Sequence, residues 1–254
     1  MFCVIVLYKT TYNCIRRTIQ KYKRTQKRTY CEKRYFNNGQ IMEKIWCNYN
    51  SHCRTGGPAR ISYYTNGNIE TSLWYKNRQA HRVGAPAFIS YHENGNIKEK
   101  LWFKYGKLHR EDGPATVKYY ENGNNEETLY YKYGKLHRAD GPATIKYYEN
   151  RNIEVEGWYK NGQEHRKNCP AILQYYENGN IEVEVWFNNG LAHRTNCPAM
   201  VRYHKNGKIK SEKWYKNGRK HRKFKPAVVV YNENGNIIVT EFYERGSYIG
   251  HIEY

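Results

Sequence analysis

The sequence predicts an all-β protein, an elongated antiparallel β-meander built from tandem β-hairpins. Three observations predict it: a 28-residue repeat, alternating apolar residues within each repeat, and a central Asn-Gly turn. The repeat is marked by the seven prolines of the 254-residue chain, which follow one another at intervals of 28 residues. They are Pro58, Pro86, Pro114, Pro142, Pro170, Pro198 and Pro226. Such a period is the signature of a repeat array, in which each unit packs on its neighbours.

The first strand of each unit follows its proline. Alanine comes directly after the proline, an aliphatic residue two positions later and tyrosine two further, as in Ala171, Leu173 and Tyr175. Apolar residues at every second position are typical of a half-buried β-strand.

The turn that follows contains Asn-Gly in six of the seven units. The exception, Asn150-Arg151, is expected to be strained if that position is left-handed. We favour a three-residue loop, 177–179 in the fifth unit, with its glycine in a G1 bulge. A two-residue type I′ turn would place Tyr175 on the same face as Glu182, whereas the bulged loop groups the apolar residues of both strands on one face. That face is Ala171, Leu173, Tyr175, Ile181, Val183, Val185 and Phe187.

The second strand, typified by residues 181–187, carries every tryptophan of the chain at one position, and Tyr130 and Phe242 take that position in two units. The tryptophans are Trp46, Trp74, Trp102, Trp158, Trp186 and Trp214. A second turn, such as Asn161-Gly162, and a His-Arg-x-x-x-Pro-Ala segment then close the unit. Two strands per unit predict an advance of about 10 Å per repeat.

The chain divides into a basic N-terminal segment, residues 1–30, and a repeat array, residues 31–254, whose first unit is partial because Tyr30 stands in place of the proline. The segment has eight basic side chains and no acidic one. Residues 11–29 are predicted to form a basic helix, and residues 2–7 an edge strand. A solvated tail or a poorly ordered cap is the alternative.

The segments Trp102-Phe103-Lys104-Tyr105-Gly106-Lys107 and Tyr119-Tyr120-Glu121-Asn122-Gly123-Asn124 resemble the MORN repeat family, above all its variant class of bacterial proteins and large DNA viruses. The resemblance covers residues from about 31 to 254. It departs from the family in unit length, 28 residues instead of the low twenties, through the inserted His-Arg-x-Asp-Gly-Pro segment. The resemblance implies a single-sheet hairpin ribbon that serves in scaffolding, dimerisation or membrane-associated assembly and has no catalytic residues.

Composition restricts the class of protein. Only 39% of the residues are hydrophobic and the net charge is +20, but 27 tyrosines and six tryptophans supply the apolar surface that a disordered chain lacks. No apolar run reaches the roughly 18 residues of a transmembrane helix. Seven scattered cysteines do not form a disulfide framework, and no Asn-x-Ser/Thr acceptor is present. We expect a cytoplasmic protein, in the host cytoplasm if viral, that is peripheral to a membrane if it binds one.

Histidine and arginine recur together, five and four residues before six of the prolines. Catalytic and metal sites are normally built once from different residues, so we interpret both as parts of the framework. The arginines are expected to pair with Glu156, Glu184 and Glu212 or to stack on the tryptophans. The alternative is a ladder for an anionic polymer or phospholipid headgroups. Its candidate anion-binding residues are Arg16, Arg17, Lys21, Lys23, Arg24, Lys27, Arg28, Arg82, Arg110, Arg138, Arg166, Arg194 and Arg222.

The sequence therefore predicts a non-enzymatic scaffold with no catalytic residue, cofactor, metal or small-molecule substrate. Its expected partner is a protein, including a second copy, since one layer leaves an apolar face and two sheet edges uncovered. The alternative is electrostatic binding of an anionic membrane surface or nucleic acid through the basic segment and the arginines.

Overall fold

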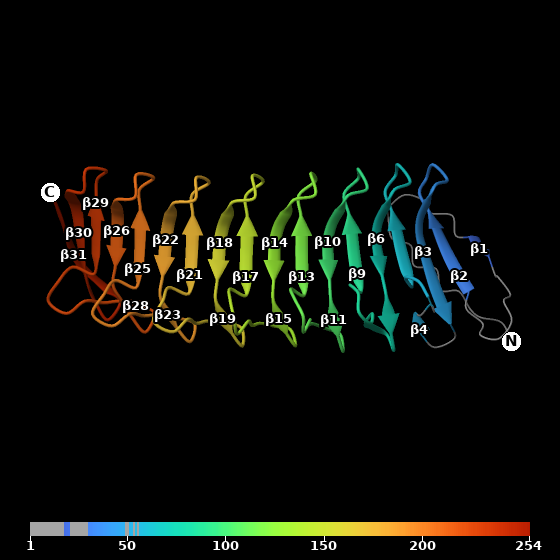
Figure 1. Cartoon of the computed structure of the whole chain (residues 1–254), viewed down its shortest axis with the longest axis horizontal. Coiled ribbons are helices and arrows are strands. Elements are labelled where there is room, and N and C mark those ends of the chain that lie inside the picture. The colour runs from blue at the N-terminus through green and yellow to red at the C-terminus, as the bar shows by residue number, and fades with distance from the viewer. Residues whose placement is uncertain (1–17, 21–29, 49–50, 53, 55) are drawn as a thin grey trace.

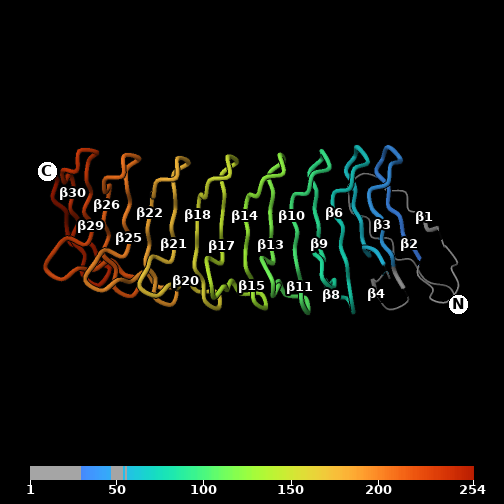
Figure 2. Tube along the Cα trace, viewed as in Figure 1, coloured from blue at the N-terminus to red at the C-terminus, as the bar shows by residue number. Residues whose placement is uncertain are grey.

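A computed structural model describes residues 18–20, 30–48, 51–52, 54 and 56–254. This part of the chain is an elongated ribbon whose strands lie across its long axis, from the N-terminal to the C-terminal end (Figure 1). The Cα trace in Figure 2 shows each repeat adding one pair of strands beside the previous pair. Within these residues, 19 strands form one antiparallel sheet, which confirms the predicted hairpin meander.

The strands of the sheet follow chain order along the ribbon. For example, β22 pairs with β21 through the hairpin of its own unit and with β25 of the next unit. The sheet comprises β1 (Thr18–Gln20), β2 (Tyr30–Tyr35), β3 (Ile41–Asn48), β4 (Ser51–His52), β5 (Arg60–Tyr63), β6 (Ile69–Leu73), β9 (Phe88–Tyr91), β10 (Ile97–Leu101), β13 (Thr116–Tyr119), β14 (Asn125–Leu129), β17 (Thr144–Tyr147), β18 (Ile153–Gly157), β21 (Ile172–Tyr175), β22 (Ile181–Val185), β25 (Met200–Tyr203), β26 (Ile209–Lys213), β29 (Val228–Tyr231), β30 (Ile237–Glu244) and β31 (Ser247–Glu253).

The turn of each long hairpin is the predicted three-residue loop. In the fifth unit the Tyr176 N–H donates to the Asn180 carbonyl and the Gly179 N–H donates to the Tyr176 carbonyl, both at 2.8 Å. These bonds enclose residues 177–179, and Gly179 has a φ of +89°. Arg151 occupies the same position in its unit with a φ of +72°, so the left-handed conformation on which the expected strain depends is present.

A second irregularity, which the sequence analysis did not predict, lies just beyond the loop. Tyr175 pairs with Ile181, but Gln174 pairs with Val183, so Glu182 is an extra residue on the second strand. This β-bulge shifts the alternation of β22 by one residue relative to β21. The same shift occurs in the long hairpin of every unit from β2–β3 to β29–β30.

The bulge makes the predicted wholly apolar face wrong. Leu173 lies opposite Glu184, whereas Val185 lies opposite Ile172. Since paired residues of antiparallel strands share a face, Leu173, Tyr175 and Glu184 lie on one side, which we call the tyrosine face. The opposite side of the sheet carries both valines and polar residues. Val183, for example, pairs there with Gln174 of its own unit and with Arg202 of the next unit.

The most deeply buried position is the alanine after each proline, at 0–1% exposed in all seven units. Ala171 donates its N–H to the Val185 carbonyl of its own unit and accepts a hydrogen bond from the Trp158 N–H of the preceding unit. Alanine thus lies where three backbone segments meet, which leaves space for only a methyl group. Larger apolar side chains are mostly half-buried, since the sheet has one layer.

A second, short hairpin follows each of the six long hairpins from β5–β6 to β25–β26. Its turn has two residues, both with positive φ, as in Asn189 (+50°) and Gly190 (+78°), which is the type I′ geometry. These hairpins lie along one edge of the ribbon, opposite the Asn-Gly loops (Figure 1). They are β7–β8 (Tyr75–Lys76, Gln79–Ala80), β11–β12 (Phe103–Lys104, Lys107–Leu108), β15–β16 (Tyr131–Lys132, Lys135–Leu136), β19–β20 (Tyr159–Lys160, Gln163–Glu164), β23–β24 (Phe187–Asn188, Leu191–Ala192) and β27–β28 (Tyr215–Lys216, Arg219–Lys220).

The predicted basic helix over residues 11–29 is wrong where the structure describes it. Residues 18–20 form the strand β1, which pairs with β2 through Thr18 and Lys33. The β-sheet extends to this segment because β2 offers an unpaired edge, and edge pairing outweighs the helical spacing of apolar residues. The edge strand predicted at residues 2–7 lies outside the described residues.

Candidate functional site

Six arginines belong to the His-Arg-x-x-x-Pro segments that follow the short hairpins, which we call the return segments, and all six are built into the fold. Each guanidinium lies over an aromatic ring of its own unit, 3.7–4.3 Å from the ring centroid, and donates from Nη1 to the carbonyl of the next proline at 3.3–3.5 Å. The pairs are Arg82–Trp74, Arg110–Trp102, Arg138–Tyr130, Arg166–Trp158, Arg194–Trp186 and Arg222–Trp214. Stacking on the tryptophans is therefore the correct alternative of the two structural roles considered for these residues.

The repeat glutamates bind tyrosine instead of arginine. Tyr175 donates to Glu156 at 2.9 Å, and the equivalent Tyr203 and Tyr231 donate to the glutamates of the units before them. Desolvation, with the neighbouring carboxylate, raises the pKa of Tyr203 to about 12. The expected arginine–glutamate pairing is replaced because the bulge brings tyrosine and glutamate onto one face.

The recurring histidines connect neighbouring units. His137 donates its backbone N–H to the Tyr130 carbonyl at 3.0 Å, and its Nδ1 accepts from the Asn161 N–H of the next short hairpin at 3.2 Å. His109, His193 and His221 accept equivalent bonds at 3.3–3.4 Å. The interpretation of histidine as a framework residue is supported by these bonds.

The Asn-Gly loops form the first edge of the ribbon, which we call the loop edge. Tyr148 donates its hydroxyl to the Tyr175 carbonyl of the next unit at 2.8 Å, and Asn152 donates to the Glu177 carbonyl at 2.8 Å. Both bonds recur between most neighbouring units. They hold in place a row of exposed glutamates at the first loop position: Glu93, Glu121, Glu149, Glu177 and Glu233, with Lys205 in the sixth unit.

The short hairpins form the second edge, which we call the hairpin edge. They are joined in series, since the Gly162 N–H donates to the Leu136 carbonyl at 2.8 Å and four equivalent bonds of 2.8–3.0 Å follow the same pattern. The hairpins and return segments have 19 basic and four acidic side chains over residues 75–85, 103–113, 131–141, 159–169, 187–197 and 215–225. One lysine row runs along them: Lys76, Lys104, Lys132, Lys160 and Lys216, with Asn188 in the fifth unit.

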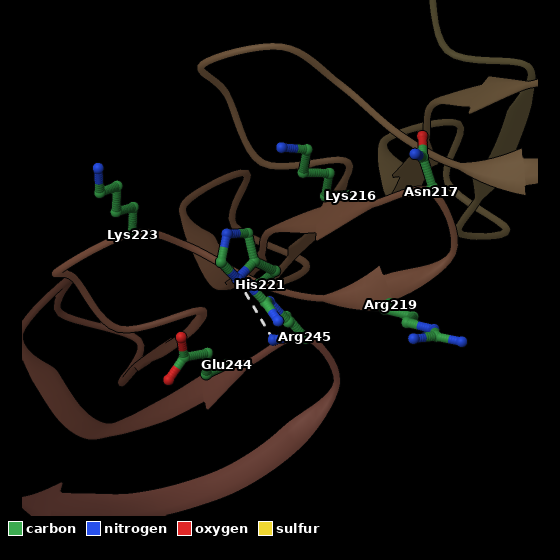
Figure 3. A pocket seen from close by; sticks show the side chains of 7 residues that line it. All are labelled: Lys216, Asn217, Arg219, His221, Lys223, Glu244 and Arg245. Carbon is green, nitrogen blue, oxygen red and sulfur yellow. Dashed lines mark hydrogen bonds between the residues drawn. The ribbon is translucent and has the colours of Figure 1, made fainter.

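A cavity of about 640 Å³ lies at the C-terminal end of the hairpin edge. It is lined by Lys216, Asn217, Arg219, His221, Lys223, Glu244 and Arg245 (Figure 3). His221 Nδ1 accepts from the Arg245 N–H at 3.4 Å, while Lys216 and Lys223 extend away from the imidazole. The cations do not converge on one point, so the cavity is an open part of the basic edge.

The arrangement offers two electrostatic surfaces, the basic hairpin edge and the loop edge with its exposed glutamates. Within the described ranges, no group of three or more His, Cys, Asp or Glu could hold a metal ion. No helix in the same ranges is long and apolar enough to span a bilayer. Seven of the predicted anion-binding residues, in the segment 16–28, lie outside the described residues; the other six are the stacked, half-buried arginines.

The two edge rows are the residues that the sequence analysis missed. Lys104 and Lys132, like Glu121 and Glu149, are 28 residues apart, a spacing that is visible in the sequence. The glutamates belong to the predicted bulged loops, and the lysines were given no role. The structure places the two rows on opposite edges, with opposite charge.

The fold and its edges define a single-layer β-hairpin repeat protein. The family model of the MORN repeat variant matches residues 87–105, 172–189 and 199–217, so these three segments are MORN-variant repeats, as the resemblance indicated. MORN repeats generally bind proteins or membranes. A comparison with curated proteins finds no match.

Proposed function

We propose that this protein is a non-enzymatic intracellular scaffold that binds protein partners along the edges of its ribbon. The observation that carries the proposal is the use of recurring polar side chains in bonds between units. Tyr148, Asn152 and His137 each bond to the unit that follows. Side chains committed to neighbouring repeats fix a long surface of constant spacing, which suits binding better than chemistry.

The charge of the ribbon supports an edge as the binding surface. The hairpin edge is basic and the loop edge bears exposed glutamates, so the two edges select partners of opposite charge. The alternative partners of such a basic protein, anionic membrane and nucleic acid, would use the hairpin edge, because the return-segment arginines are already stacked on aromatic rings.

Photo-crosslinking in cells tests this function. A photoreactive residue in place of Tyr105 or Tyr133, both exposed on the hairpin edge, should capture the same discrete protein species from two neighbouring units. The same residue at Asn66 and Asn94 samples the loop edge. Capture of nucleic acid or lipid instead of protein at both edges would overturn the proposal.

A further inference from the structure

The lysine row of the hairpin edge and the glutamate row of the loop edge have the same spacing. Each row recurs once per 28-residue unit, and each unit adds two strands, or about 10 Å, to the ribbon. Two ribbons lying side by side in the same direction would therefore bring one row against the other without losing register. The rows lie on opposite edges, so they cannot meet within one chain.

The order of charges along the rows distinguishes between alignments. With no shift between the copies, Lys205 would meet Lys216 and Glu233 would meet Glu244, which are two repulsive contacts. With a shift of one unit, all five glutamates meet lysines: Glu93 with Lys76, Glu121 with Lys104, Glu149 with Lys132, Glu177 with Lys160 and Glu233 with Lys216.

The shift also accounts for the exception in each row. Lys205 is the one basic residue among the loop glutamates, and Asn188 is the one neutral residue among the hairpin lysines of the first six units. A shift of one unit places Lys205 opposite the neutral Asn188. The one basic residue of the loop row therefore does not face a lysine of the other copy. The opposite shift pairs four charges instead of five: Lys205 would meet Glu244, but Glu149 would meet Asn188 and Glu233 would lie beyond the row.

Most of these charges are available for a partner. Lys76, Lys132, Lys160 and Lys216 are exposed and form no ion pair with another described residue. Lys104 is the exception, since its Nζ lies 2.7 Å from Glu111 of its own return segment. On the other edge, Glu121 has 80% of its side chain exposed.

From these relationships we infer that the partner of each edge is a second copy of this chain, bound side by side, in parallel, with a stagger of one repeat. The inference rests on the proposed scaffold function and names its partner. The contact joins different surfaces of the two copies, so it leaves one edge of each copy open and can add further copies. Exposed ion pairs are individually weak and screened by salt, so association depends on concentration and ionic strength.

Sedimentation of the nuclease-treated full chain tests the association. The chain has a mass of 30.4 kDa. We expect a higher average mass at about 0.15 M salt, where the repulsion between whole molecules is screened beyond about 8 Å, and a monomer at about 1 M. An association that nuclease treatment removes, or one that persists at about 1 M, would overturn the inference.

Charge reversal identifies the edges. One variant carries Glu121→Lys, Glu149→Lys and Glu177→Lys, and the other carries Lys104→Glu, Lys132→Glu and Lys160→Glu. Each should be monomeric alone, the two should associate when mixed, and a chain with both sets should regain association. The control, Lys98→Glu with Lys210→Glu, reverses exposed lysines away from both rows and should associate normally. Two variants that stay monomeric when mixed, although folded by circular dichroism, contradict the inference.

Carbodiimide coupling of carboxylates to amines measures the stagger in the unmodified chain. With a mixture of isotopically labelled and unlabelled chains, we expect intermolecular Glu149–Lys132 and Glu177–Lys160 links. Links of Glu149 to Lys160 would show an unshifted contact and refute the stagger. Failure of all these tests while photo-crosslinking still captures another protein would leave the proposed scaffold function intact.

Discussion

The hydroxyl of Tyr203 donates a 3.0 Å hydrogen bond to Oε2 of Glu184, which belongs to the preceding repeat. The two side chains lie on the tyrosine face, next to the strand pair β22–β25 that joins the repeats. Two further junctions have the same bond, from Tyr175 to Glu156 and from Tyr231 to Glu212. A half-buried hydroxyl and a carboxylate thus connect the two units at this face, beside the backbone hydrogen bonds between β22 and β25.

Stability should decrease at high pH through these tyrosines. Desolvation and the adjacent carboxylates raise the pKa of Tyr203 and Tyr231 from the ordinary value of 10.0 to about 12. Between pH 10 and 12 the unfolded chain therefore loses these protons while the folded chain keeps them. The stabilisation that these two tyrosines contribute is therefore fully present below pH 10 and is lost as the pH rises toward about 12. Denaturant unfolding at a series of pH values measures it.

Removal of the carboxylate charge should lower the pKa of its tyrosine. In Glu184→Gln the coulombic effect on Tyr203 disappears, so tyrosinate absorbance should develop at lower pH than in the unmodified chain. The residual increase comes from desolvation, the largest cause. The control Glu182→Gln changes the bulged residue, which does not bond to Tyr203. An identical titration of Glu184→Gln and the unmodified chain would refute this assignment.

The buried alanines should tolerate no larger side chain. Ala143 is 0% exposed, so Ala143→Val must displace backbone or neighbouring side chains at the junction between units. Such overpacking costs about 1–3 kcal/mol. Thermal unfolding should show the loss for Ala143→Val, whereas Ala139→Val, four residues earlier and exposed, should unfold as the unmodified chain does.

The stacked arginines should contribute more to the free energy of unfolding than exposed lysines of the same charge. Arg166 lies 3.7 Å from the Trp158 ring centroid and bonds to the Pro170 carbonyl, so Arg166→Ala loses a stack and a hydrogen bond. A loss of about 1–2 kcal/mol in the free energy of unfolding is expected. The adjacent Lys167 is exposed, and Lys167→Ala removes the same charge as a control. Equal effects of the two variants would show that charge alone matters.

The loop at Arg151 should be stabilised by glycine. Arg151 has a φ of +72°, a region that costs non-glycine residues about 1–2 kcal/mol, so Arg151→Gly should raise the free energy of unfolding by up to about 1 kcal/mol. The substitution also removes the 3.0 Å bond from Arg151 Nε to Asn124, which is exposed and weak. Arg151→Ala loses that bond but retains the strained φ, so it should be less stable than Arg151→Gly.

Much of the fold could be predicted because its determinants are local and repeated. Alternation around Leu173 predicts a strand, and the Asn178-Gly179 pair predicts the bulged loop, since both depend on neighbouring residues. Repetition also identified His137 and Arg166 as framework residues. Their particular partners, Asn161 and Trp158, are fixed by how the short hairpin and return segment fold, which no pattern of single residues specifies.

The assignment of residues to faces failed at one residue. Glu182 adds a position to the second strand, so alternation alone puts Val183 beside Leu173, where the structure has Glu184. A signal was present: the bulged position is charged in six of the seven units, at Glu70, Lys98, Glu126, Glu154, Glu182 and Lys210. The edge charges could have been located from the sequence, because consecutive turns of an antiparallel meander lie on opposite edges of the sheet. What single-residue patterns do not show is the short hairpin that presents the lysines.

The orientation of the strands across the ribbon determines how it would respond to tension. The strands lie across the long axis (Figure 1), and the hydrogen bonds of an antiparallel sheet are perpendicular to its strands, so a force that separates the two ends pulls paired strands directly apart. Bonds loaded in this way break in sequence, beginning at an end, and each repeat that opens releases 28 residues of slack. Stretched between two attachment points, the chain would lengthen in equal steps and act as an extensible tether.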